Sequence, residues 1–123
     1  MKLEEIEQNA ILRLSLEFSV TIVGFCEEME SLRKYVISKQ LLRCGTSIGA
    51  NAMEAQHAES DADFVHKMKI AAKEACETQY WLLVCDRTGN CPTTNHLHER
   101  LEVINRILSS IIGTSKRKKR PNP

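Results

Sequence analysis

Proline is absent from the first 91 residues of this chain. Proline interrupts helices because it lacks a backbone N–H and its ring clashes with the preceding turn. The long gap before Pro92 therefore leaves room for several uninterrupted helices. Aromatic residues are also scarce, at 5% of the chain, whereas hydrophobic residues in total reach 42%. The core must rely on leucine, isoleucine, valine and alanine, which suits helix packing.

The chain also lacks an apolar run that approaches the roughly 20 residues needed to span a bilayer. It begins with no signal-peptide pattern, and its cysteines are odd in number and scattered, at Cys26, Cys44, Cys76, Cys85 and Cys91. Such cysteines are typical of a reducing compartment. We therefore expect a cytoplasmic protein that makes no membrane contact.

Recognised patterns of metal or catalytic chemistry are missing as well. His96 and His98 lie two residues apart, Cys85 and Cys91 lie six apart, and neither spacing matches a zinc site. We find no glycine-rich phosphate loop and no convincing Ser-His-Asp order. These absences predict a non-catalytic protein with no metal and no cofactor.

Helical periodicity is what the sequence does contain. Its 123 residues suffice for one domain. Apolar residues recur at spacings of three and four in four segments, at about residues 2–28, 32–59, 61–87 and 93–113. The clearest seam is Phe64, Met68, Ala71, Ala75, Thr78, Leu82 and Cys85. Long helices with short connections predict an all-α, antiparallel up-down-up-down four-helix bundle.

Local signals suggest where these segments begin and end. Ser60 is placed to cap the third helix, and any of residues 93–95 is suited to start the fourth. The charged stretch at residues 27–31 is the expected first turn. Gly113 is placed to stop the last helix, so we predict a bundle over residues 1–113 and a disordered tail over residues 114–123.

The first segment carries a second apolar face. Ile11, Phe18 and Ile22 belong to the face expected to line the core. A further row widens the apolar surface, and it consists of Leu12, Leu16, Val20 and Val23. A helix apolar over so much of its surface is typically buried on two sides, which predicts self-association through this second face.

The segment 40–58 combines small residues with a polar row. Gly45 and Gly49 sit in an otherwise helical stretch, where each glycine costs about 1 kcal/mol relative to alanine, so we expect a neighbouring element to approach closely. The polar row falls on one helical face and consists of Arg43, Ser47, Asn51 and Glu54.

Two hypotheses explain this polar row. It forms a surface for a partner or nucleic acid, or it belongs to a buried structural network in which Arg43 pairs with Glu54, Glu74 or Glu77. We favour the network, because buried charges persist when they are paired and hydrogen-bonded.

The blocks LLRCGTSIGANAMEA and DFVHKMKIAAKEACETQYWL follow one another here. Over residues 38–85 the chain resembles the small bacterial four-helix-bundle family named after the 23S rRNA intervening sequences that encode some members. That family includes the accessory variability proteins of diversity-generating retroelements. The resemblance implies the same bundle and a ring-like homopentamer, and it implies action with nucleic acid and a reverse transcriptase for some members. The polar row matches the family's Arg, Ser, Asn and Glu positions.

Basic residues gather in two places. Lys67, Lys69 and Lys73 could form a basic face with Lys39 and Arg43, although nearby glutamates favour a mixed-charge surface. The second group is Lys116, Arg117, Lys118, Lys119 and Arg120. The whole chain has a net charge of +1. The five residues of this second group contribute +5, and the rest of the chain, with twelve basic and sixteen acidic residues, contributes −4.

We expect the basic tail, with Lys39, Arg43 and Lys67, to meet phosphate in an oligomeric, non-catalytic accessory protein that binds RNA or DNA. A solubilising tail remains the other interpretation, and the alternative function is a protein-interaction scaffold with no nucleic-acid contact. Tyr80 and Trp81 are adjacent and point in different directions on a helix, so we expect one to pack in the bundle and the other at an interface or groove.

Overall fold

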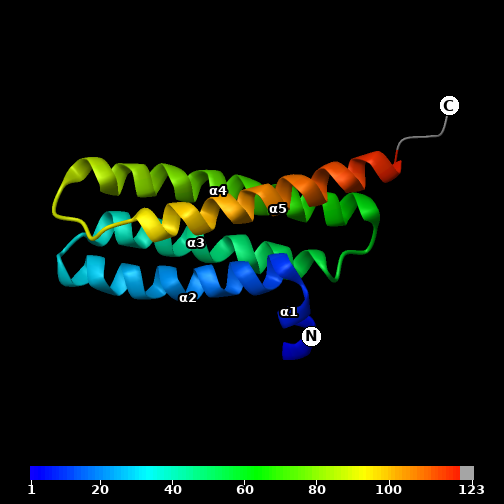
Figure 1. Ribbon diagram of the computed structural model, residues 1–123, viewed down its shortest axis with the longest axis horizontal. Helices are drawn as coiled ribbons and strands as arrows, with labels where there is room; N and C mark the ends of the chain where they lie inside the picture. The colour runs from blue at the N-terminus through cyan, green and yellow to red at the C-terminus, as the bar shows by residue number, and fades with distance from the viewer. Residues whose placement is uncertain (120–123) are drawn as a thin grey trace.

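A computed structural model describes the backbone of residues 1–119 and the side chains of residues 1–116. These residues form helices and no strand. Four long helices run up, down, up and down, as the sequence predicts (Figure 1), and a short helix precedes them. The helices are α1 (Leu3–Gln8), α2 (Ala10–Ser31), α3 (Tyr35–Ala55), α4 (Asp61–Thr88) and α5 (Asn95–Lys119).

The four long helices form a square in cross-section. α3 packs on α2 and α4, and α5 packs on the same two helices from the other side. Helices α2 and α4 are therefore diagonal neighbours, with no close backbone approach between them within the described residues. The start of α4 and the end of α5 lie at the same end of the bundle (Figure 1).

The predicted apolar seams meet in one core. The fully buried large side chains include Phe18 and Ile22 of α2, Ile48 of α3, Leu82 of α4 and Leu101 of α5. The seam predicted for the third helix is buried throughout except at Phe64, which is half-buried beside the buried Val65.

Helices α2 and α3 approach closely along the glycine-bearing face. Gly45 lies against Ile22 and Gly49 lies against Ser15, which confirms the close approach predicted from the two glycines. Nearby, Ser38 and Cys26 exchange hydrogen bonds: the Ser38 hydroxyl donates to the Cys26 carbonyl oxygen (3.1 Å), and the Cys26 thiol donates to the Ser38 carbonyl oxygen (3.4 Å). The interface is therefore narrow and internally hydrogen-bonded.

The first predicted helix is in fact two helices. Asn9 has extended backbone angles (φ −104°, ψ 112°), and its side chain accepts a hydrogen bond from the Leu12 N–H at 3.3 Å. Asparagine is a favoured residue at this capping position. It starts α2 afresh, and α1 turns away from the bundle (Figure 1).

The first turn lies later than predicted. Residues 27–31 are helical, and the chain turns through residues 32–34, where Arg33 has a left-handed φ of 62°. The second long helix ends at Ala55 and not at residue 59. The next helix starts as predicted, since the Ser60 hydroxyl accepts the Asp63 N–H at 3.1 Å.

The helix end predicted at Gly113 is wrong. Helix α5 continues through Gly113 to Lys119, so residues 114–119 are helical and not disordered. A glycine stops a helix when it takes a left-handed conformation. Among the described glycines, a positive φ occurs at Gly89 (72°), which ends α4. Residues 120–123 of the predicted tail lie outside the described residues.

Candidate functional site

Arg43 of α3 bridges to two carboxylates of α4. Its Nη1 lies 3.4 Å from Oε2 of Glu74, and its Nη2 pairs with Oε2 of Glu77 and donates to Oε1 of Gln40 at 3.3 Å. The Arg43 side chain is 50% exposed. The predicted pairing with Glu74 and Glu77 is present, but it lies on the surface and not in the interior.

The rest of the polar row bonds locally. The Ser47 hydroxyl donates to the Arg43 carbonyl oxygen (2.6 Å), and the Asn51 amide donates to the Ser47 carbonyl oxygen (2.8 Å). Glu54 meets Lys67 of α4 at 3.9 Å and is not paired with Arg43. The row therefore contains two separate α3–α4 ion pairings, one at Arg43 and one at Glu54, and the hydroxyl and amide between them bond to the backbone of α3.

Two of the four predicted phosphate contacts with described side chains are already engaged in ion pairs. Lys39 is exposed on α3, whereas Arg43 and Lys67 are already paired with carboxylates. Lys116 is exposed near the end of α5. The other four predicted tail contacts, Arg117, Lys118, Lys119 and Arg120, have side chains outside the described part of the chain.

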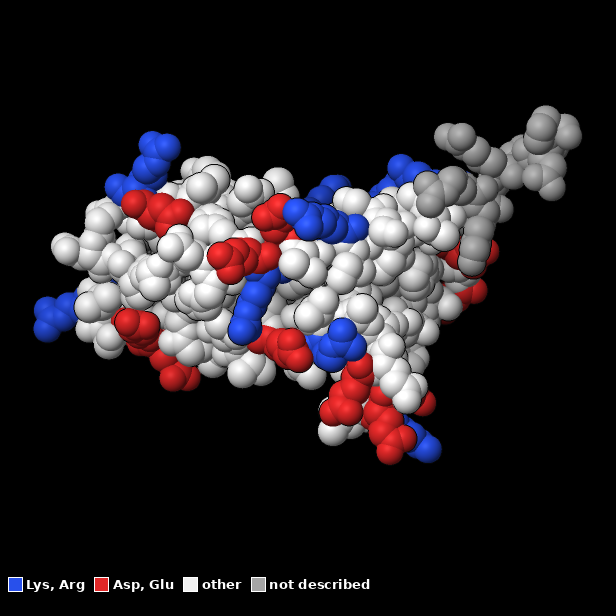
Figure 2. All heavy atoms as spheres, in the orientation of Figure 1, with Lys and Arg blue, Asp and Glu red and all other residues white. Residues whose placement is uncertain are grey.

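Charge is mixed along the body of the bundle. On the face shown in Figure 2, basic and acidic side chains alternate along the long helices, and carboxylates gather on the protruding N-terminal segment. That segment contains Glu4, Glu5 and Glu7, all exposed. A polyanion would therefore find no uniformly basic surface on this side.

An apolar face of α2 remains open, as the sequence predicts for an interface. Leu16, Val20 and Val23 are exposed, and Val20 reaches 66%. Leu12, the fourth member of the predicted row, is buried in the core instead. Beside them, an apolar groove of about 210 Å³ runs between α2 and α3, with Gly49 and Met53 in its wall.

A polar cluster at the α4–α5 turn was not predicted from the sequence. Asp86 accepts a hydrogen bond from the Thr94 hydroxyl, and its Oδ2 lies 2.8 Å from Nε2 of His98. Burial pushes the Asp86 pKa up, but the Thr94 and His98 bonds and the His98 charge outweigh it and lower the pKa. Thr94 and His98 lie eight and twelve positions after Asp86 in the sequence, and no local motif signals that they meet it.

The cysteines and carboxylates offer no obvious reactive centre. Burial raises the pKa of the Cys26 and Cys44 thiols and raises that of Cys85 to about 12. Within residues 1–119, no three metal-ligating side chains of His, Cys, Asp or Glu come together. No helix in the same residues combines the length and apolar character needed to cross a membrane.

Comparison with known proteins agrees with the fold. The profile of the family described as "23S rRNA-intervening sequence protein" matches residues 7–110. A crystal structure of a protein of unknown function from the S23 ribosomal protein family of Bacteroides thetaiotaomicron superposes with a TM-score of 0.79. The two sequences are 45% identical, over 83% of this chain and 97% of that one. No curated protein matches the chain.

Proposed function

The chain belongs to the 23S rRNA-intervening sequence protein family, and from this premise we propose that it is a non-catalytic, oligomeric accessory protein that binds nucleic acid through the basic end of α5. The observation that carries the proposal is a separation of charge. Residues 103–123 contain six basic residues and not one aspartate or glutamate, whereas the chain as a whole has seventeen basic and sixteen acidic residues.

The helical continuation of α5 supports this assignment. Because α5 runs to Lys119, the backbone of the first four basic residues of the run 116–120 is helical. Lys116 is exposed at the start of this run. Helical order reduces the conformational entropy lost when several cations bind one polyanion. Contacts of this kind go to phosphate and give affinity without reading the base sequence.

Self-association would raise the affinity for nucleic acid further. The exposed apolar face of α2, with Leu16, Val20 and Val23, is the surface we assign to contacts between copies of the chain. The homopentamer expected by resemblance would place several basic segments in one particle. Linked binding segments raise the overall affinity well above that of one segment, because later contacts become intramolecular.

The compartment and the partners complete the proposal. All five cysteines are free in the structure, which fits the reducing cytoplasm. The ligand is RNA or DNA from the rRNA intervening sequence or a retroelement. A reverse transcriptase is the protein partner that we would test first.

The deciding experiment measures RNA and DNA binding at several salt concentrations. We compare the native chain with a variant whose five basic residues 116–120 are all glutamine, which keeps a helix-forming segment. Each lost phosphate contact should lower the salt slope by about 0.7 for a single strand, so five contacts predict a loss of about 3.5. Equal binding by the two proteins would contradict the role of the α5 end.

A second candidate function is a protein-interaction scaffold. It is favoured by an apolar patch at the α2–α3 turn, where Leu32, Tyr35 and Val36 are all exposed, Val36 at 74%. Salt-insensitive binding of one purified protein, lost in a Val36→Asp variant, would support the scaffold. Binding that falls steeply with salt supports nucleic acid instead.

A further inference from the structure

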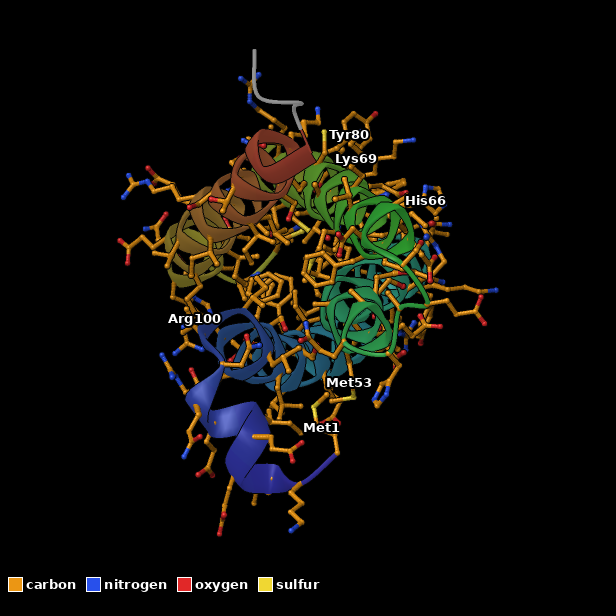
Figure 3. All side chains as sticks on the ribbon, turned by 90° about the vertical axis from the view of Figure 1, so that its right-hand side faces the viewer. Met1, Met53, His66, Lys69, Tyr80 and Arg100 are labelled. Atoms are coloured by element: carbon orange, nitrogen blue, oxygen red, sulfur yellow. The ribbon has the colours of Figure 1, made fainter. Side chains whose placement is uncertain are left out.

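The outward side of α4 carries a face without a carboxylate. Its positions alternate by three and four residues, so they form one stripe along the helix, and all seven side chains are exposed. Figure 3 shows the labelled His66, Lys69 and Tyr80 on the same outward side of α4. We call this stripe the α4 basic face, and it consists of His66, Lys69, Lys73, Cys76, Tyr80, Leu83 and Arg87.

The central cations of this face are free to meet a ligand. Within the described side chains, neither Lys69 nor Lys73 forms an ion pair or a side-chain hydrogen bond. The carboxylates of Glu74 and Glu77 lean toward α3, where Arg43 holds them. The charge of the two lysines is therefore not cancelled by their nearest acidic neighbours.

An aromatic ring stands in the same stripe. Tyr80 is 60% exposed, and its ring meets the Trp81 ring edge-on, with centroids 5.4 Å apart and planes at 80°. Trp81 is itself fixed, because its Nε1 donates to Oε2 of Glu77 at 3.1 Å. Tyr80 is thus an exposed ring held in place, and exposed rings between cations are how proteins stack unpaired bases.

The α4 basic face also has suitable length and position. From residue 66 to residue 87 a helix rises about 30 Å, enough for several nucleotides. The His66 end of the stripe lies at the end of the bundle where α5 finishes (Figure 1). Because α4 is diagonal to α2, this stripe and the apolar α2 face lie on opposite sides of the bundle.

We propose that the α4 basic face binds single-stranded nucleic acid, with phosphates at Lys69 and Lys73 and a base stacked on Tyr80. The inference rests on the proposed function and deepens it, because it adds a second contact surface and a preference for unpaired bases. Duplex bases are already stacked on each other, so a protruding tyrosine offers them little. The sequence pattern predicted that Lys69 and Lys73 lie on this helix. It could not show that the neighbouring glutamates pair with Arg43 of α3 and not with these lysines.

The first test concerns the two lysines. The probe is a labelled polyuridine RNA of about 20 nucleotides, longer than the site of a typical single-strand-binding domain. We expect Lys69→Gln with Lys73→Gln to weaken binding about tenfold and to lower the salt slope by about 1.4. The matched control, Arg13→Gln with Arg100→Gln, removes two exposed charges from α2 and α5 that lie outside both proposed contact surfaces, and it should leave the slope unchanged.

The second test concerns the ring. Tyr80→Ala should weaken binding of the polyuridine by about tenfold, since base stacking contributes substantially at such sites. The same variant should bind a duplex RNA of equal length as well as the native protein does. Tyr80→Phe keeps the ring and should keep the affinity. Equal losses for Tyr80→Ala on single-stranded and duplex RNA would overturn the stacking contact.

The outcomes separate this inference from the proposed function. If the lysine variant binds like the native chain while the five-glutamine variant at residues 116–120 does not, the α4 contact is wrong and the α5 contact stands. If the native chain binds no RNA or DNA at low salt, both fail. Thermal melting of each variant shows whether a loss of binding reflects unfolding.

Discussion

Gly45 of α3 lies directly against Ile22 of α2, and a methyl group at Gly45 would stand 3.1 Å from both Cγ1 and Cγ2 of that side chain. Ile22 is completely buried in the core. It has little room to move aside, because protein interiors are close-packed. The glycine thus sets how near the two helices can come.

Gly45→Ala should therefore destabilise the protein. Overpacking a core typically costs about 1–3 kcal/mol, which exceeds the gain of about 1 kcal/mol from replacing a helical glycine. Gly24→Ala is the matched control, since nothing lies within 4 Å of its Cβ position and it is exposed in α2. We expect it to stabilise. Urea unfolding of both variants checks the opposite signs, and shifts in the same direction would contradict the close contact.

Arg43→Ala should lower stability modestly, by about 1 kcal/mol or less, because exposed ion pairs contribute little. The loss should shrink as salt screens the charges. Thermal melting at low and high salt measures it. A double-mutant cycle with Glu77→Gln, which keeps an acceptor for Trp81, isolates the pair. A salt-independent loss of several kcal/mol would indicate the buried network that the sequence suggested.

The cysteines should differ sharply in reactivity. Cys76 is exposed on α4, whereas Cys85 is buried and burial raises its pKa to about 12. The thiolate is the reactive form, so Cys85 stays protonated at neutral pH and should be alkylated last. Mass spectrometry after timed iodoacetamide treatment gives the order. Labelling of Cys85 as fast as Cys76 in the folded protein would contradict this burial.

Asp86 should make stability depend on acidic pH. Its pKa is lowered below the ordinary 3.8, since the bonds from Thr94 and His98 outweigh the effect of burial. The unfolded state then takes up the proton first, so the stabilising contribution is present above about pH 4 and is lost as pH falls further. The stability difference between the native chain and Asp86→Asn should shrink over this range in urea titrations. A constant difference would argue against the Asp86–His98 contact.

Val20→Asp should disrupt self-association. A carboxylate placed in an apolar interface is costly to desolvate, and Val20 is the most exposed of the three residues on the open α2 face. Light scattering should show a smaller particle than for the native chain, with unchanged helix content by circular dichroism. The matched control, Val103→Asp, changes an exposed valine of α5. An unchanged particle mass for Val20→Asp would show that the interface between copies does not lie on this face of α2.

The sequence by itself determined the class of fold. The spacing of apolar residues identifies which face of a helix is buried, as in the row Leu97, Leu101, Ile104 and Leu108. This is a local property of each helix and does not depend on how the helices are arranged. The Ser60 cap is equally local, since donor and acceptor are three residues apart. Gly45 and Gly49 predicted the close approach of another element, although the sequence did not show that this element is α2.

Only the tertiary structure decided which surfaces remain available. Whether Arg43 would meet Glu74 and Glu77 depended on the relative height of α3 and α4, and this is fixed by packing along the whole interface. Glu54 is out of direct reach because it lies on the same helix, about 16 Å further along the axis. Gly113 is a stop signal in isolation, yet α5 passes through it, because a single helical glycine costs only about 1 kcal/mol. The α4 basic face also depends on the packing of α3 against α4. Because Glu74 and Glu77 pair with Arg43 of α3, Lys69 and Lys73 remain exposed without a carboxylate partner.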